Sequence, residues 1–400
     1  MISKHVFGFA ALALSLVACP SSPPPITADC TLSSNITTPT TLSPSVCSSY
    51  TVTKPLDVTA ALTIQPGTTL KFASSAGLQI EATGSLNATG TVALPITFTG
   101  TMGTSGFWRG LVFRSNDTAN KLVYANILYA GSETFCCDYE DKAAVTLGGN
   151  ILASPVQVTM ANTTINGSGG YGVYLFETGS LPGFTSNTFK SNTQAPVSLP
   201  ISRVENLDST TVYSGGAQPN TQQFVRVLQA DNDTNVTQTM RKLDVPYRIS
   251  AGVAGKQLRY NGALTINAGA TLEFEADSGL AISNTGTLTV NGTTLEPVIF
   301  KGRQSTLGYW KGINILSTGN SITNATIRDA GSSTFCCSQN SAAKAGISLG
   351  ENISDNAAVS VTNTAFINNV YGMYRHSDPT NVFTDGGGNT FSGNTTNKNF

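Results

Sequence analysis

A long internal repeat constrains the fold of this chain more than any other feature. The stretch Leu62–Phe72 (LTIQPGTTLKF) returns as Leu264–Phe274 (LTINAGATLEF), 202 residues later. Gly106–Gly110 (GFWRG) matches Gly308–Gly312 (GYWKG) at the same offset, and other matches follow in the same order. Because self-similarity at a fixed offset is the signature of repeat architectures, the chain is a tandem duplication with about 200 residues in each copy.

Each copy contains a finer rhythm of very short strands. Segments with alternating apolar positions, such as Leu62–Ile64 and Leu70–Phe72, are separated by Gly, Asn or Pro turns. The alternation indicates that each strand buries one face. The connections vary in length and are not the two-residue turns of hairpins, so the pattern predicts stacked coils rather than antiparallel pairs.

Asparagines followed by threonine recur where the coils are expected to turn. Asn162 and Asn187 in the first copy have the counterparts Asn363 and Asn389 in the second. A coil corner needs a residue that tolerates positive φ, and Gly and Asn do so most readily. We therefore expect these four asparagines to occupy positive-φ corners.

The repeated strings resemble those of a known family. The string from Leu62, followed by GSLNATGT, PITF and GFWRG, is similar to the right-handed parallel β-helix repeat proteins of bacterial cell surfaces, and so is Val245–Ile249 (VPYRI) at the start of the second copy. The resemblance implies an all-β, right-handed parallel β-helix (solenoid) built from two tandem copies of about 200 residues. It implies little about function, because this fold hosts polysaccharide lyases, glycoside hydrolases, adhesins and structural spacers.

The N-terminus predicts export and a lipid anchor. The apolar run Val6–Val17 follows Lys4 and ends in Leu16-Val17-Ala18-Cys19, which resembles the lipobox of bacterial lipoproteins. The resemblance implies cleavage before Cys19, acylation of its thiol, and attachment to the bacterial cell envelope at the outer membrane or cell surface. The alternative is an ordinary secretory signal with a chance cysteine.

These features divide the sequence into four parts, and we expect the two β-helix copies among them to form one continuous solenoid rather than to bend at residues 201–246. The parts are the signal peptide (1–18), a Pro/Ser/Thr-rich tether and N-terminal cap (19–47), the first β-helix copy with its connecting segment (48–246), and the second copy (247–400).

Charge is scarce in this chain. Only 11% of the residues are charged, with 22 basic against 23 acidic residues and no run of Lys or Arg. A nucleic-acid partner is therefore not expected. No zinc-type spacing and no phosphate-binding loop occur, so we expect no cofactor, with calcium as the one open possibility.

Two acidic clusters are candidates for chemistry. Asp138, Glu140 and Asp141 could act as catalytic carboxylates or bind calcium, and the alternative is a solvated loop. The second copy has Ser338–Ser341 in the corresponding place, so such a role would belong to the first copy alone.

The other cluster alternates oxygen-bearing side chains like the start of a calcium loop. It consists of Asp231, Asp233 and Asn235, and it lacks the glycine and the distant glutamate of an EF-hand. The alternative is an Asx-rich turn that joins the two copies.

Six cysteines remain after Cys19, an even number that fits an oxidising compartment. Cys30 and Cys47 flank a polar segment, and a disulfide between them would attach the tether to the first coils. We expect this bond.

Each copy also carries two adjacent cysteines. The pairs are Cys136-Cys137 and Cys336-Cys337, which lie roughly 40 Å apart if the coils stack at about 4.8 Å and so cannot join each other. Each pair is a strained vicinal disulfide, two thiols, or a set of metal ligands that needs outside partners. The simplest role is to fix a protruding loop.

Aromatic residues stand beside a cation in each copy, and this combination can stack on sugar rings. The alternative is that the tryptophans pack inside their coils. The candidate glycan contacts are Phe107, Trp108, Arg109, Tyr309, Trp310 and Lys311.

The sequence therefore favours a lipid-anchored, non-catalytic envelope protein that binds glycans, above all neutral ones, or surface-layer or other envelope partners. One alternative is a polysaccharide lyase or glycoside hydrolase that uses Asp138, Glu140 and Asp141, and a second is a purely structural spacer. No amphipathic helical pattern is visible near Asn397–Phe400, so we expect either that the polar segment Ser392–Asn399 blunts the edge of the final coil or that another subunit covers it.

Overall fold

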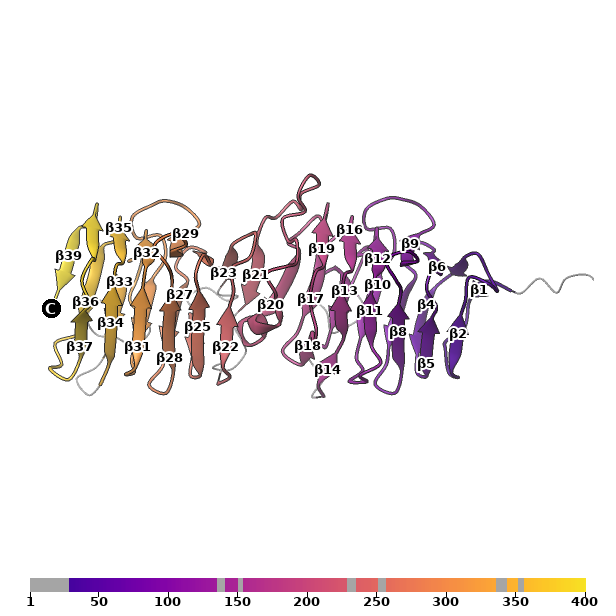
Figure 1. Cartoon of the computed structure of the whole chain (residues 1–400), viewed down its shortest axis with the longest axis horizontal. Coiled ribbons are helices and arrows are strands. Elements are labelled where there is room, and N and C mark those ends of the chain that lie inside the picture. The colour runs from indigo at the N-terminus through magenta and orange to yellow at the C-terminus, as the bar shows by residue number, and fades with distance from the viewer. Residues whose placement is uncertain are drawn as a thin grey trace, which may run out of the picture.

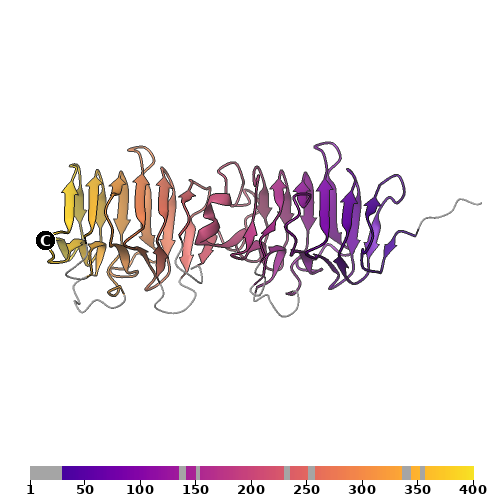
Figure 2. The ribbon, with the colours of Figure 1, turned by 90° about the horizontal axis from the view of Figure 1, so that it is seen from below.

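The computed structural model describes residues 29–134, 141–149, 154–228, 235–250, 257–335, 344–351 and 356–400. These residues form short strands and one short 3-10 helix, η1 (Ile201–Asn206). The strands stack into an elongated rod with the first and last coils at opposite ends (Figures 1 and 2).

The strands of successive coils pair in parallel, which confirms the predicted all-β parallel solenoid. In the first copy, one face is a seven-stranded sheet and another a five-stranded sheet, beside a two-stranded one. The seven-stranded sheet contains β1 (Thr31–Leu32), β3 (Tyr50–Val52), β6 (Thr69–Phe72), β9 (Ile96–Gly100), β12 (Ala125–Leu128), β16 (Thr164–Asn166) and β19 (Thr188–Lys190). The five-stranded sheet contains β2 (Thr40–Leu42), β5 (Ala61–Ile64), β8 (Ser85–Thr89), β11 (Lys121–Val123) and β15 (Thr159–Ala161), and the two-stranded sheet contains β14 (Val156–Gln157) and β18 (Gly179–Ser180).

A thirteen-stranded sheet, here called the long sheet, runs through both copies. It contains β4 (Pro55–Val58), β7 (Gly77–Ile80), β10 (Gly110–Phe113), β13 (Ala143–Leu147), β17 (Tyr171–Leu175), β20 (Val197–Pro200), β21 (Val225–Leu228), β23 (Tyr247–Ser250), β26 (Thr271–Phe274), β29 (Val298–Gly302), β32 (Ala325–Arg328), β35 (Ala365–Ile367) and β38 (Thr390–Ser392).

Two six-stranded sheets complete the second copy. One contains β22 (Gln238–Met240), β25 (Ala263–Asn267), β28 (Thr287–Asn291), β31 (Asn320–Thr323), β34 (Ala358–Thr362) and β37 (Val382–Asp385). The other contains β24 (Leu258–Tyr260), β27 (Gly279–Ile282), β30 (Gly312–Ile315), β33 (Ala345–Leu349), β36 (Tyr371–Arg375) and β39 (Thr396–Asn399).

Inward-facing apolar residues form continuous rows that make up the core. In the first copy, one row consists of five side chains that are fully buried and neighbours in register: Leu70, Phe98, Ile127, Ile165 and Phe189. The corresponding row in the second copy is Leu272, Phe300, Ile327, Phe366 and Phe391. The duplication seen in the sequence is thus a duplication of core rows.

The long sheet is built from different strands of the repeat in the two copies, and it passes from one set to the other at the junction between them. Strands β6 and β26 have equivalent sequences, yet β6 belongs to the seven-stranded sheet and β26 to the long sheet. The equivalent strands β7 and β27 likewise belong to different sheets. The change takes place over β20, β21 and β23, which continue the sheet from one copy into the next (Figure 1). The solenoid is therefore continuous, and the described residues between 201 and 246 form a junction that neither repeat contains.

Two of the four asparagines predicted to occupy positive-φ corners do so. Asn162 and Asn363 have φ values of 50° and 48°. Asn187 and Asn389 are not among the positive-φ residues of the described chain, and they join coils through their amides instead. The Asn187 Oδ1 accepts from the Thr163 amide at 3.0 Å, and Nδ2 donates to the carbonyl of Met160 at 3.1 Å.

The two ends of the described solenoid bear on two further predictions. Cys30 and Cys47 are joined by the predicted disulfide. Near the other end, Thr396–Asn399 form β39 and pair with β36, so this polar segment supplies the last strand of its sheet. Whether it protects the edge of the final coil stays a prediction. Association through this end stays a prediction.

Candidate functional site

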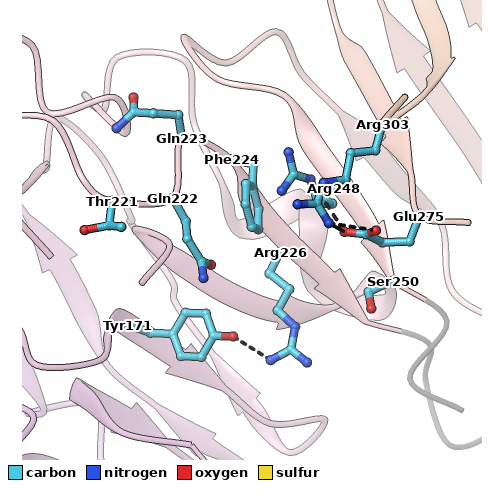
Figure 3. A pocket seen from close by; sticks show the side chains of 10 residues that line it. All are labelled: Tyr171, Thr221, Gln222, Gln223, Phe224, Arg226, Arg248, Ser250, Glu275 and Arg303. Atoms are coloured by element: carbon cyan, nitrogen blue, oxygen red, sulfur yellow. Dashed lines mark hydrogen bonds and ion pairs between the residues drawn. The ribbon is translucent and has the colours of Figure 1, made fainter. Parts of the chain in front are cut away.

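A groove of about 520 Å³ lies at the junction, on the outer side of the long sheet (Figure 3). Its walls come from the start of β17, from the segment before β21, from β21 and β23 themselves, and from the residues that directly follow β26 and β29. The lining residues are Tyr171, Thr221, Gln222, Gln223, Phe224, Arg226, Arg248, Ser250, Glu275 and Arg303.

Strand alternation explains why two arginines face this groove. On β21, Val225 and Val227 are fully buried, so Arg226 between them points outward. On β23, Tyr247 and Ile249 are buried in the same way and turn Arg248 outward. The two arginines are direct neighbours in the parallel register.

Arg226 is fixed by two groups of the first copy. Its Nη1 lies 3.0 Å from Asp141 Oδ2 and donates to the hydroxyl of Tyr171 at 2.6 Å. Burial of this side chain disfavours its charge, but the nearby Tyr171 and Asp141 outweigh that effect and raise the pKa of Arg226. Burial, aided by Asp141, raises the pKa of Tyr171, so the phenol stays neutral.

Arg248 is fixed by an aromatic ring and a carboxylate. Its guanidinium carbon lies 3.7 Å from the centre of the Phe224 ring, and its Nη2 donates to Glu273 at 2.8 Å. Glu273 also pairs with Lys301 at 2.9 Å. Burial would raise the pKa of Glu273, but the hydrogen bonds from Arg248 and Lys301 outweigh it and hold that pKa below 4.5.

Arg303 completes the wall on the side of the second copy. Its Nη1 lies 3.3 Å from Glu275 Oε2, and half of its side chain, 52%, is exposed. Figure 3 shows this pair opposite Tyr171 and Arg226.

The groove offers polar groups rather than ring faces to a ligand. Tyr171 and Phe224 are only 4% and 9% exposed, and they contact Arg226 and Arg248 beside them. Gln223 and Thr221 are exposed, and Arg226 keeps 28% of its side chain accessible. The site can therefore donate many hydrogen bonds and carries positive charge, but it has little apolar surface for stacking.

The two tryptophans predicted to contact glycans belong to the core, which corrects that prediction. Trp108 and Trp310 are fully buried, and their rings stack 4.0 Å from Phe72 and Phe274. Each indole donates to a backbone carbonyl, at 2.8 Å for Trp108 and 2.7 Å for Trp310. Neither indole has a free face for a sugar.

The residues beside the tryptophans are also committed to the fold. Phe107 and Tyr309 are partly buried and pack against the core. Arg109 pairs with Glu133 at 3.0 Å, and this bond lowers the pKa of Glu133. Lys311 is only 4% exposed. These residues do not form an open aromatic platform in either copy.

Several predicted site residues lie outside the described residues. They are Cys19, Cys136, Cys137, Asp138, Glu140, Asp231, Asp233, Cys336 and Cys337. Of the two acidic clusters, Asp141 is described and pairs with Arg226, and Asn235 is described and exposed. In the described ranges, no three His, Cys, Asp or Glu side chains gather as metal ligands.

Sequence analysis missed Arg226, Arg248 and Arg303. The signal available was an arginine between two apolar residues in Val225–Val227, in the segment that joins the copies, and again in Tyr247–Ile249, at the start of the second copy. The sequence alone does not show that these two segments pair side by side, because that requires the order of strands in the sheet.

Comparisons with known proteins identify no relative. No family model, no curated protein and no solved structure matches this chain. None of the helices among the described residues has the length and apolar character needed to cross a membrane.

Proposed function

We propose that this protein binds a polysaccharide of the bacterial cell envelope, to which its own N-terminal lipid anchors it, and that it does not cleave this ligand. The observation that carries the proposal is the junction groove, an open trough across neighbouring coils. Its accessible lining consists of guanidinium, amide and hydroxyl groups and one carboxylate, Glu275, all of which are hydrogen-bonding partners for the hydroxyls of a sugar chain.

The carboxylates at the groove support binding rather than catalysis. A glycosidase needs a carboxylic acid with a raised pKa to protonate the leaving group. Instead, Glu273 has a lowered pKa and pairs with Arg248 and Lys301, Glu275 pairs with Arg303, and Asp141 pairs with Arg226. Each carboxylate positions a cation.

Size-exclusion chromatography of the purified full chain with fluorescently labelled polysaccharides tests this function. We expect a polysaccharide to shift to earlier fractions and to co-elute with the protein at unchanged chain length. Labelled material that elutes later, as shorter chains, would favour a lyase or hydrolase. An unchanged profile for a panel of acidic and neutral polysaccharides would overturn the proposal and favour a structural spacer.

A further inference from the structure

The junction groove places like charges in neighbouring positions. Arg226 and Arg248 are neighbours on β21 and β23, an arrangement that costs stability unless opposite charges, here Asp141 and Glu273, balance it. Arg303 adds a third guanidinium, whereas Glu275 is the one carboxylate among the described lining residues. Asp141 and Glu273 pair with Arg226 and Arg248 but do not line the groove, so the surface that a ligand meets carries more guanidinium than carboxylate. This surface points to an anionic ligand.

The arginines are oriented by hydrogen bonds that occupy only some of their N–H donors. A guanidinium has five N–H donors. In the described part of the chain, the hydrogen bonds of Arg226 leave from Nη1, towards Asp141 and Tyr171. Those of Arg248 leave from Nε and Nη2, towards Glu273. Each side chain therefore keeps donors for a ligand, and its orientation is fixed before the ligand arrives.

The ligand must be recognised by charge because stacking is not offered. Neutral sugars gain much of their affinity from aromatic faces, and the rings of Tyr171 and Phe224 are covered. The tryptophans of both copies are buried as well. This lining therefore favours a charged polysaccharide over the neutral one that the sequence suggested.

We propose that the groove binds an acidic polysaccharide through the carboxylates of its uronate residues, which pair with Arg226, Arg248 and Arg303. This inference rests on the proposed glycan-binding function and specifies its ligand class. The arginines come from three of four successive coils along the rod, so they match charges that recur along a chain better than one compact anion. The amides of Gln222 and Gln223 lie on the wall beside them, where sugar hydroxyls would pass.

A matched pair of polymers separates charge from shape. Polygalacturonate and its fully methyl-esterified form share one backbone, and only the first carries carboxylates. We expect the full chain to be retarded in affinity electrophoresis through gels that contain polygalacturonate or alginate, and not through gels that contain the ester. Because ion pairs are screened, added sodium chloride should weaken the retardation.

Point variants locate the interaction. We expect Arg226→Gln and Arg303→Gln each to weaken binding roughly tenfold, since each removes a charge-assisted contact. Arg303→Lys keeps the charge and should recover most of the loss. The matched control is Lys71→Gln, which removes an exposed charge from β6, away from the long sheet. Circular dichroism checks that each variant is folded.

The outcomes separate the two proposals. Equal retardation by the acidic polymer and its ester would overturn the charged ligand and leave glycan binding intact. Retardation by neutral polymers alone would do the same. No retardation in any gel would overturn both proposals, and binding that folded Arg226→Gln and Arg303→Gln variants retain in full would move the ligand to another surface.

Discussion

At the scale of single residues, Trp108 carries the clearest prediction about stability. Its buried ring stacks on Phe72 and its indole nitrogen is bonded to the carbonyl of Leu128, so truncation leaves a cavity and an unpaired acceptor. We expect Trp108→Ala to lower the free energy of unfolding by about 3–5 kcal/mol in urea titrations. Trp108→Phe, which keeps a ring, should lose less. A variant with native stability and lost glycan affinity would restore Trp108 as a ligand contact.

Glu273 sets the pH dependence at the junction. Because its folded pKa is lowered, its ion pairs contribute stability above the unfolded pKa, near 4.5, and lose it as pH falls through the folded pKa. We expect Glu273→Gln to cost roughly 1–3 kcal/mol at neutral pH. The difference from the natural chain should shrink in acid. Urea titrations at both pH values check this, and a pH-independent difference would contradict it.

At the scale of elements, the disulfide ties the exposed strand β1 to the first complete coil. Cys47 is only 3% exposed, whereas Thr31 at the start of β1 is exposed. Removing the bond with Cys30→Ser and Cys47→Ser should cost about 3 kcal/mol by the loop-closure estimate. Because coils contact only their neighbours, hydrogen exchange should rise in β1 and β3 and stay unchanged in β30 and β33. A rise throughout the second copy would contradict local stabilisation.

Some elements could be predicted from the sequence because period-two alternation reports burial directly. Leu70–Phe72 reads as a strand with one buried face, and β6 is such a strand. The string around Trp108 gives no alternation, so the sequence could not tell a core ring from an exposed one. Asn162 and Asn187 both precede threonine, yet one supplies a positive φ and the other an amide bridge. Local sequence cannot separate these two uses.

The groove could not be predicted for a different reason. Arg226 and Arg248 are 22 residues apart in sequence, and they meet only because β21 pairs with β23. That pairing belongs to the change of strand within the long sheet, which appears in neither repeat. Comparing one copy with the other therefore finds the duplicated core and misses the site that occurs once.

At the scale of the whole molecule, the junction joins two copies through one sheet. Of the sheets in the described chain, only the long sheet continues from the first copy into the second. The seven-stranded sheet ends at β19, and the six-stranded sheets begin at β22 and β24. The hydrogen bonds of β21 to β20 and β23 therefore couple the folding of the two copies.

A proline in β21 tests this coupling. Val227→Pro removes a backbone donor from the ladder, whereas Val227→Ala only shortens a buried side chain and serves as the control. The chain has two tryptophans, one buried in each copy, so Trp310→Phe leaves Trp108 to report on the first copy, and Trp108→Phe leaves Trp310 for the second. We expect the two fluorescence transitions in urea to coincide when Val227 is kept and in the Val227→Ala control, and to separate in Val227→Pro. Coincident midpoints in the proline variant would show that the copies are coupled by contacts other than the long sheet.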